Sequence, residues 1–417
     1  MYQRVIFFLQ FASIMIVTFP LRFLPLRVVR ALGYFCGHAL FYLFPKFRKR
    51  TLSNLALATD LHLTQKEIIK TAKESFVNLC ITILEYPKLK STFFFRKMVV
   101  CENPEVAKSF TDEGQGVIFF CAHQANWEVL FMDGNLRMPG VAIGKPIKNP
   151  FLYRWVVSVR ERFGGKIIPP KRATWEGMRA LKQGKFLGIV GDQGMPSSDF
   201  ESSFLGRRAY TSTIPALLAY KSKSPLLTAL IKRTKTGYSI KYTQPLIPDT
   251  SKPLEEEVSR LMNGVLDETQ KSIIERPGEW LWQHNRWKQE TPHTVFYKYR
   301  HESLLVVANK KTPLDVLTVF REIYPRSFLT YIVPKDMSPL IDHIADEVIT
   351  FTHAPPFVAD FRFKLVFDFT DSKIYDKYKS LSAFDVLHKK DITDTHVEPK
   401  HVIEKLCRGG VLPYAGI

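Results

Sequence analysis

The chain has 417 residues, which is too long for one ordinary core, so at least two domains are expected. Hydrophobic residues make up 46% and charged residues 24%, a globular composition that excludes wholesale disorder. The net charge is +19, but helix-turn-helix, zinc-finger and RNA-recognition signatures are missing from the sequence, so no nucleic-acid partner is predicted.

The amino-terminal segment is apolar and its flank is basic. Val5–Phe19 is almost wholly apolar and stops at Pro20, and residues 1–59 contain Lys and Arg but no Asp or Glu. The apolar run is slightly short for a span of ~30 Å of hydrocarbon. Residues 1–28 are therefore predicted to form a membrane-anchoring helix, which either spans the membrane or lies in its interface. The basic flank favours the cytoplasmic side for the rest of the chain, and a cleaved signal peptide fits less well.

The middle of the chain alternates between short apolar runs and helical patterns. A helix is predicted over Leu63–Leu84, with a capping-box pattern at Thr64 and Glu67. Strands are predicted at Val117–Phe120, Val141–Ile143, Lys166–Pro169, Phe186–Val190, Leu226–Ile231 and Tyr238–Tyr242. Helices are predicted at Pro150–Phe163, Arg172–Gln183, Thr213–Lys221 and 253–275. This alternation predicts an α/β fold, a mostly parallel sheet flanked by helices, over residues 29–292.

A second pattern follows residue 292 and predicts a small α/β domain over residues 293–417. Its strands are predicted at Leu304–Ala308, Phe328–Val333 and Lys364–Phe369, and its helices at Pro313–Tyr324 and Met337–Asp346. It carries neither a G-x-G-x-x-G nor a P-loop motif, so nothing in it identifies a cofactor. A sugar- or nucleotide-binding fold, a docking module and a stabilising appendage remain equal alternatives for its role.

The most informative residue pair is His123 and Glu128. His123 comes at the carboxyl end of the predicted strand Val117–Phe120, where ligands and catalytic groups collect in open α/β sheets. If Glu128 lies in the first turn of the next helix, its carboxylate reaches an imidazole nitrogen, fixes the tautomer and raises the basicity of the ring. Such a pair takes a proton from a hydroxyl nucleophile. Alone, the pair is better explained by a hydrogen-bonded histidine and a glutamate favoured by the helix dipole, and the rest of the chain reverses this preference.

Three later segments carry further polar residues in a fixed order. They are Lys145–Pro150 with Arg160 and Gly164, then Gly191–Gln193 with Phe204–Gly206 and Thr211, and finally Pro277–Lys288. With His123–Glu128, the chain up to about residue 292 resembles the late acyltransferases of lipid A biosynthesis, the lauroyl/myristoyl transferase family. The matching motifs are an H-x-x-N-W-E block, R-x-x-x-G, an aspartate-glutamine pair ahead of a phenylalanine-glycine, and a closing W-x-H-x-R-[FW]-K. In this chain Gln124–Ala125 replaces the commoner bulky-small pair.

The resemblance implies a bacterial inner-membrane enzyme, anchored at the cytoplasmic face. It implies transfer of a fatty acyl chain from an acyl carrier protein thioester, or from acyl-CoA, to a hydroxyl of a lipid A precursor. His123 is then the general base and Glu128 its orienting partner. The acceptor attacks directly, so neither an enzyme nucleophile nor a cofactor is expected; a G-x-S-x-G elbow is not found.

The remaining candidates are predicted to bind substrate. Arg160 would stabilise an oxyanion or hold a phosphate, although a surface charge on its helix explains it equally well. Asp192 and Gln193 follow the strand Phe186–Val190 and are placed at the edge of the site as support or acceptor contacts. Asn126 would bind substrate or simply cap and pack its helix. Arg286 lies among Trp280, Trp282 and Trp287, a stripe that suits lipid phosphates or a membrane interface slightly better than a tryptophan core.

Two other functions stay open. A glycerolipid acyltransferase shares the His-x4-acid logic, but the F-P-E-G block usual in those enzymes is missing from the sequence. A non-catalytic membrane-associated binding protein is the second alternative, and it requires the acyltransferase motifs to have lost their catalytic role. The five cysteines are scattered without a C-x-x-C pair, so neither a zinc site nor a disulfide framework is predicted. Acyl chain length, the acceptor hydroxyl and the oligomeric state are not encoded in any recognisable motif.

Overall fold

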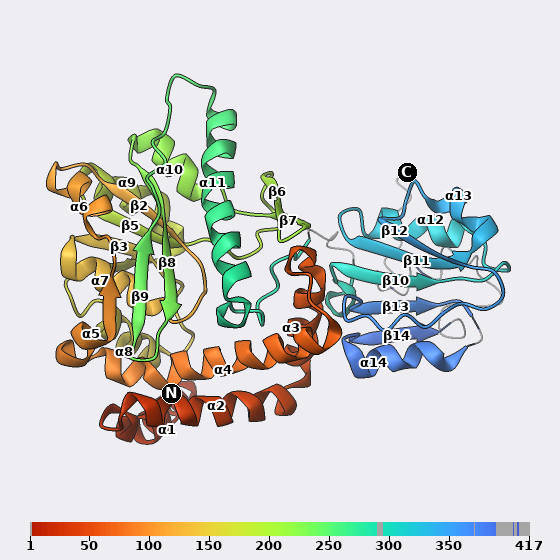
Figure 1. The fold of residues 1–417 in the computed structure, drawn as a ribbon, viewed down its shortest axis with the longest axis horizontal. Helices are drawn as coiled ribbons and strands as arrows, with labels where there is room; N and C mark the ends of the chain where they lie inside the picture. The colour runs from red at the N-terminus through yellow and green to blue at the C-terminus, as the bar shows by residue number, and fades with distance from the viewer. Residues whose placement is uncertain (1, 290–294, 371, 389–402, 404–406, 408–417) are drawn as a thin grey trace. The chain divides into compact units, whose positions relative to one another are not determined.

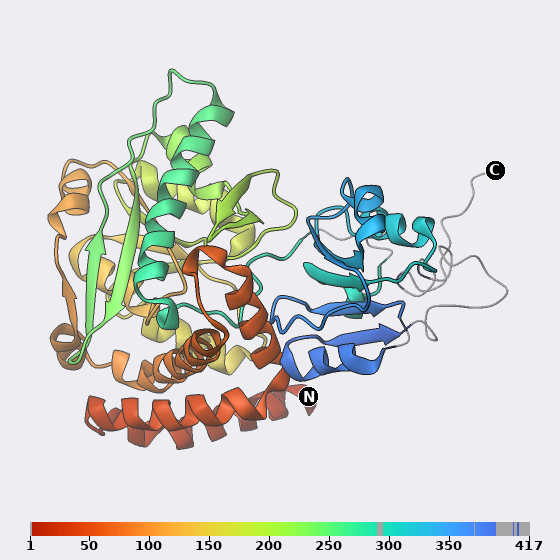
Figure 2. The ribbon, with the colours of Figure 1, turned by 45° about the vertical axis from the view of Figure 1, so that its right-hand side comes forward.

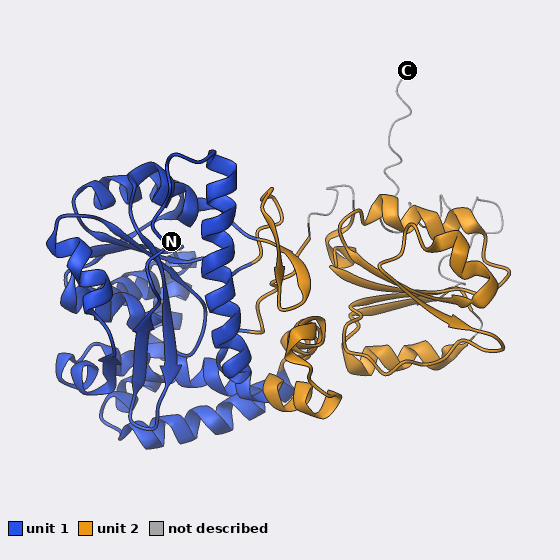
Figure 3. Cartoon of the chain, turned by 45° about the horizontal axis from the view of Figure 1, so that its top comes forward, with its two compact units in different colours: residues 1–43, 73–193, 211–281 blue, residues 44–72, 194–210, 282–417 orange. Residues whose placement is uncertain are grey.

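The computed structural model describes residues 2–289, 295–370, 372–388, 403 and 407, and the chain divides into two compact units (Figure 3). Unit 1 comprises Met1–Leu43, Lys73–Gln193 and Thr211–Leu281, and unit 2 comprises Phe44–Ala72, Gly194–Tyr210 and Trp282–Ile417. The domain boundaries expected near residues 28 and 292 remain predictions. Parts of the predicted 293–417 domain lie outside the described residues.

Unit 1 is built on a seven-stranded sheet with the order β1-β9-β8-β2-β5-β3-β4 (Figure 1). All neighbouring strands run parallel except β8 and β9. The strands are β1 (Val99–Cys101), β2 (Val117–Cys121), β3 (Gly140–Ile143), β4 (Lys166–Ile168), β5 (Phe186–Val190), β8 (Leu226–Arg233) and β9 (Tyr238–Tyr242). β2 is buried along its whole length because the sheet is covered on both faces. The predicted α/β class is confirmed.

Helices connect these strands and cover the sheet. They are α5 (Thr92–Met98), α6 (Glu105–Asp112), α7 (Glu128–Arg137), α8 (Pro150–Arg160), α9 (Ala173–Lys182), α10 (Ile214–Ser222) and α11 (Leu254–Glu275). α9, α10 and α11 pack side by side, with α9 against β5 and α11 against β8, while α7 packs on α8. α8 starts where Asn149 caps Phe151 and Leu152 with its side chain and Pro150 occupies the first turn.

The amino-terminal helices α1 (Tyr2–Thr18) and α2 (Leu26–Leu43) precede α4 (Gln65–Leu89). The predicted capping box holds, since the Thr64 amide donates to Glu67 Oε2 at 2.8 Å. α2 approaches α4 closely at two glycines: a Cβ on Gly37 would meet Val77 Cα at 2.4 Å, and one on Gly33 would meet Ile81 Cγ1 at 2.5 Å. Only glycine permits this backbone separation. α2 and α4 lie along the lower edge of unit 1 in both Figure 1 and Figure 2.

Tyr2–Arg22 is the one helical segment of the described chain that is long and apolar enough by itself to cross a membrane, and 6% of it is buried. The bent pair α2 and α3 (Pro45–Leu57) passes the same test only if the two helices are taken as one span. Length and composition therefore agree with the predicted apolar anchor.

Unit 2 contains a five-stranded, wholly parallel sheet with the order β12-β11-β10-β13-β14. The strands are β10 (Ser303–Val307), β11 (Phe328–Pro334), β12 (Glu347–Phe351), β13 (Leu365–Asp368) and β14 (Asp385–His388), with helices α12 (Leu314–Ile323), α13 (Ser338–Ile341) and α14 (Lys377–Leu381). The helix predicted at Met337–Asp346 is wrong in length. It starts as a 3-10 turn and ends at Ile341, because the chain must turn into β12. Unit 2 also holds α3 and the antiparallel hairpin of β6 (Glu201–Phe204) and β7 (Arg207–Tyr210).

Candidate active site

The register of two neighbouring strands brings His123 and Asp192 together. β2 and β5 are parallel, and Cys121 lies opposite Val190. Two residues further along each strand, the chain reaches His123 and Asp192. Side chains two positions apart point to the same side of a strand. The two residues therefore meet at the carboxyl edge of the sheet, where open α/β folds place their sites.

Asp192 is the carboxylate that holds the His123 ring. His123 Nδ1 lies 2.7 Å from Asp192 Oδ1, and the His123 amide donates to Oδ2 at 2.8 Å. The Trp280 indole also donates to Oδ2, at 2.7 Å. Burial by itself would raise the pKa of Asp192, but His123 and the Trp280 donor outweigh it and hold the pKa below its ordinary value. Asp192 therefore stays ionised at neutral pH, although it is only 1% exposed.

The other ring nitrogen faces Gln193. Because Asp192 is ionised and can only accept, Nδ1 carries the hydrogen and Nε2 carries the lone pair. Gln193 Nε2 lies 3.2 Å from His123 Nε2 and donates to it. The imidazole keeps 17% of its side-chain surface exposed, so Nε2 is the nitrogen positioned to accept a proton from an incoming hydroxyl.

The turn that carries His123 is anchored on both sides. Ala125 adopts a left-handed conformation with φ +47°, which costs a non-glycine residue on the order of 1 kcal/mol or more. Three contacts hold it: its amide donates to the Glu279 carbonyl at 2.7 Å, and its carbonyl accepts from Thr82 at 3.0 Å and from Asn78 at 3.3 Å. The Leu281 amide donates to the His123 carbonyl at 3.0 Å. These contacts fix the ring before any substrate arrives.

Glu128 has a different partner from the one predicted. It is the first residue of α7 and forms a two-bond ion pair with Arg160 at the end of α8, with distances of 2.7 and 2.6 Å. Burial alone would lower the pKa of Arg160, but Glu128 raises it above its ordinary value. Since Asp192 occupies His123 Nδ1, the expected orienting role of Glu128 is wrong. Any part that Glu128 and Arg160 play in substrate binding remains a prediction.

Tyr86 of α4 adjoins this ion pair. Its hydroxyl lies 3.5 Å from Glu128 Oε2, and its ring packs on Trp155 with centroids 5.3 Å apart. Burial and the Glu128 carboxylate raise the pKa of Tyr86 well above its ordinary value, so the phenol is neutral. No sequence motif surrounds Tyr86, and only its tertiary contacts with Glu128 and Trp155 place it here.

Asn126 and Arg286 are both buried. Asn126 donates to Glu85 of α4 at 3.5 Å, and Glu85 also pairs with Arg30 of α2 at 2.8 Å. Asn126 therefore connects the turn that carries His123 to helices α4 and α2. Arg286 lies in unit 2, where it donates to the Tyr210 carbonyl at 3.0 Å and stacks over Phe204 at 4.3 Å. These contacts explain both residues as packing partners, and their roles in substrate binding stay predictions.

The tryptophans near the end of the matched motifs are not a surface stripe. Trp280, Trp282 and Trp287 are each no more than 2% exposed, so the expectation of a membrane-facing aromatic stripe is wrong. Trp280 instead supports Asp192, a function that its sequence context gave no means of separating from core packing. The sequence did contain a signal for Asp192: like His123, it closely follows an apolar strand, so both were expected at the carboxyl edge of the sheet.

The described residues contain no group of three or more His, Cys, Asp or Glu side chains able to hold a metal ion. A mostly parallel α/β sheet that presents a carboxylate-held histidine is an arrangement typical of enzymes that use a general base. The chain belongs to the bacterial lipid A biosynthesis acyltransferase family, whose model matches residues 2–289. A comparison with curated proteins gives no match. The family places lipid A acyl transfer ahead of the glycerolipid and non-catalytic alternatives.

Proposed function

We propose that this acyltransferase moves a fatty acyl chain from an acyl carrier protein thioester to a hydroxyl of a lipid A precursor, with His123 as general base. The observation that carries the proposal is the 2.7 Å contact between His123 Nδ1 and Asp192. It replaces the His123–Glu128 pair expected from the sequence. A positioned base of this kind contributes about 10²–10⁴ in rate. The carrier-protein donor rests on the family resemblance, and acyl-CoA is its alternative.

The reaction needs one proton relay. The acceptor oxygen forms a bond to the thioester carbonyl carbon while His123 Nε2 takes the hydroxyl proton. Asp192 stabilises the imidazolium that forms, as a buried carboxylate does in other His–Asp pairs. The tetrahedral intermediate then expels the thiolate, and the imidazolium returns the proton to the sulfur. The products are an ester and a free thiol, and the enzyme is unchanged.

Gln193 must move for this step to occur. Its amide donates to His123 Nε2 at 3.2 Å, which is the atom that the acceptor hydroxyl must reach. An acceptor that displaces Gln193 leaves its N–H groups beside the reacting oxygens, where they would stabilise negative charge. We therefore assign Gln193 to acceptor binding and oxyanion stabilisation.

A direct transfer fits the chemistry of the nearest thiol. Cys121 lies two residues before His123, is 6% exposed and donates to the Phe119 carbonyl at 3.9 Å. Burial, reinforced by Asp192, raises its pKa to about 12. A thiol that stays protonated is a poor nucleophile, which supports attack by the acceptor itself. Neither step requires a cofactor.

We place the enzyme at the cytoplasmic face of a bacterial inner membrane. The apolar helix α1 exposes large side chains such as Phe8, Leu9, Ile16 and Val17. The surrounding region to residue 59 contains basic residues and no acidic one, which suits anionic lipid head groups. An exposed apolar face beside basic residues is stable in lipid rather than in water.

Purified full-length protein incubated with a lipid A precursor and a panel of acyl carrier protein and coenzyme A thioesters tests the proposal. The product should gain the mass of one acyl chain. His123→Ala and Asp192→Asn should each lose about two to four orders of magnitude in rate. Arg172→Gln, a change at an exposed residue of unit 1, is the control. Full activity of His123→Ala would disprove the catalytic assignment, and transfer from neither donor would disprove the reaction.

A further inference from the structure

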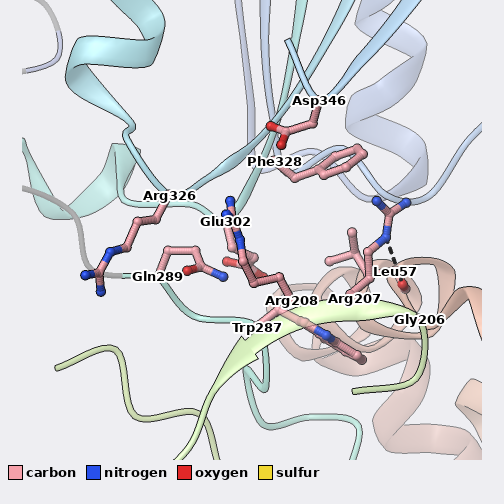
Figure 4. Close-up of a pocket in the computed structure, with 10 residues that line it drawn as sticks. All are labelled: Leu57, Gly206, Arg207, Arg208, Trp287, Gln289, Glu302, Arg326, Phe328 and Asp346. Atoms are coloured by element: carbon pink, nitrogen blue, oxygen red, sulfur yellow. Dashed lines mark hydrogen bonds between the residues drawn. The ribbon is translucent and has the colours of Figure 1, made fainter. Parts of the chain in front are cut away.

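Unit 2 contains a polar cavity of about 330 Å³ that the proposed acyl transfer does not use. Its lining combines residues of the family-matched region with residues beyond it (Figure 4). Arg207, Arg208 and Gln289 come from the first group, while Arg326, Phe328 and Asp346 come from the second. The carboxyl-terminal extension is therefore a structural part of this cavity.

The cavity carries excess positive charge. Its two carboxylates are already paired: Asp346 accepts from Arg321 at 2.6 Å, and Glu302 pairs with Lys364. Arg207 donates to the uncharged Leu57 carbonyl at 3.2 Å and stacks over Phe328 at 3.9 Å. Burial and the neighbouring Arg362 lower the pKa of Arg207 despite the opposing carboxylates Glu347, Asp360 and Asp346, so a bound anion would relieve an unfavourable charge. The arginine charges that remain after these pairings favour an anionic ligand.

Arg208 contributes an accessible guanidinium. It is 46% exposed and lies 4.0 Å from the equally exposed Glu201, a surface pair that neutralises charge only weakly. In Figure 4, the Arg208 side chain points from β7 toward Glu302, while the Arg326 side chain extends away from the other labelled residues. Guanidinium groups bind phosphate oxygens through paired charge-assisted hydrogen bonds, so phosphate is the anion that this lining suits.

Gln289 indicates that the ligand carries a hydrogen-bond donor in addition to a phosphate. The residue is 9% exposed, and its Oε1 has no hydrogen-bond partner in the described part of the chain. A buried acceptor left unpaired costs about 1–3 kcal/mol. The amide points toward the middle of the cavity in Figure 4. A phosphate monoester dianion has no hydrogen to give, so a ligand that also carries a hydroxyl or amino donor would satisfy this acceptor.

We infer that this cavity binds a phosphorylated saccharide, with Arg207 and Arg208 on the phosphate and Gln289 Oε1 on a sugar hydroxyl or amino group. The volume lies at the low end for small-ligand pockets, about 300–1,000 Å³, and suits a single sugar phosphate. The same chemistry is offered by a soluble sugar phosphate and by the head group of a phosphorylated glycolipid. The inference does not depend on His123 or on acyl transfer.

Calorimetric titration of the full-length protein in detergent tests the site without an acyl donor. Glucosamine 1-phosphate should bind at least about tenfold more tightly than glucosamine, and the Arg207→Gln/Arg208→Gln variant should lose at least that factor. The control Arg172→Gln, which removes one exposed arginine charge away from the cavity, should bind like the parent. Gln289→Leu should weaken glucosamine 1-phosphate binding but leave the binding of methyl phosphate, whose dianion carries no hydrogen-bond donor, unchanged. Melting curves of all variants confirm that they are folded.

A second arm identifies the source of the ligand. Phosphatidylcholine vesicles with and without monophosphoryl lipid A replace the soluble sugar in a flotation assay. Arginine-dependent binding of either probe supports the site. The probe that binds more tightly shows whether the ligand is a soluble sugar phosphate or a glycolipid head group. Equal binding of glucosamine and its phosphate, or unchanged binding of both probes by the folded double arginine variant, would overturn the inference.

Discussion

The indole N–H of Trp280 donates to the same Asp192 oxygen, Oδ2, that accepts from the backbone amide of His123. Trp280 follows the 3-10 turn Pro277–Glu279, and its neighbour Leu281 donates to the His123 carbonyl at 3.0 Å. A segment more than 150 residues away in sequence therefore controls both the carboxylate and the backbone of the proposed base. The proposed site is a three-part assembly of strand ends and this turn.

Trp280→Phe should slow acyl transfer about 10–100-fold while leaving His123 in place. The change removes a donor to an ionised carboxylate, worth about 1.5–3 kcal/mol. Loss of that donor raises the pKa of Asp192, so the acid limb of the rate profile should move to higher pH. Rates measured from pH 4.5 to 8 check this. A purely structural role would lower the rate equally at every pH.

Glu128→Gln should destabilise the protein by about 3 kcal/mol, because it leaves the Arg160 guanidinium largely buried without its anion. Arg160→Met in the same chain should recover part of that loss, and chemical unfolding of the two single variants and the double variant measures the coupling. If Glu128 acts only through Arg160, the folded Glu128→Gln enzyme keeps the parental pH–rate profile. A shifted profile would return Glu128 to the proton relay.

Gly37→Val should separate α2 from α4. The added Cβ would meet the Val77 backbone at 2.4 Å, and backbone atoms cannot yield as a flexible side chain can. Overpacking of this kind costs about 1–3 kcal/mol. A lower melting temperature and faster proteolysis within α2 are the expected results. Val28→Ala, which shortens a half-exposed side chain of the same helix, is the control and should melt like the parent.

His301 should make unit 2 less stable in mild acid. Burial, together with the nearby cations Lys364 and Arg50, lowers the pKa of His301 to about 4. The unfolded chain takes up this proton near pH 6.5, whereas the folded chain does so only near pH 4. Stability should therefore fall as the pH drops from about 6.5 to 4, by on the order of 1–3 kcal/mol.

His301→Gln removes this titration and can keep a donor for the Lys298 carbonyl, which His301 Nε2 contacts at 2.9 Å. Its melting temperature should depend less on pH between 7 and 5 than that of the parent. An identical pH dependence in both proteins would show that His301 does not control acid stability.

The sequence by itself determined the α/β alternation, the apolar helix before the basic flank and the family motifs. These features are local: β2 and β5 follow from short apolar runs, β9 follows from an alternating pattern, and the capping box at Thr64 and Glu67 needs only residues three apart. The extent of the segment after Met337 was not determined, because its ending depends on where β12 joins the sheet. The family match over residues 2–289 agrees with the motifs.

Only the tertiary structure decided which acid serves His123. Glu128 is close in sequence, but it starts α7 and turns to Arg160, whereas Asp192 is 69 residues away and lies in register across β2 and β5. Sequence separation gives no measure of distance between parallel strands, since each returns through a crossover to the same edge. Strand order and register, set by the packing of the whole sheet, placed the carboxylate at the ring.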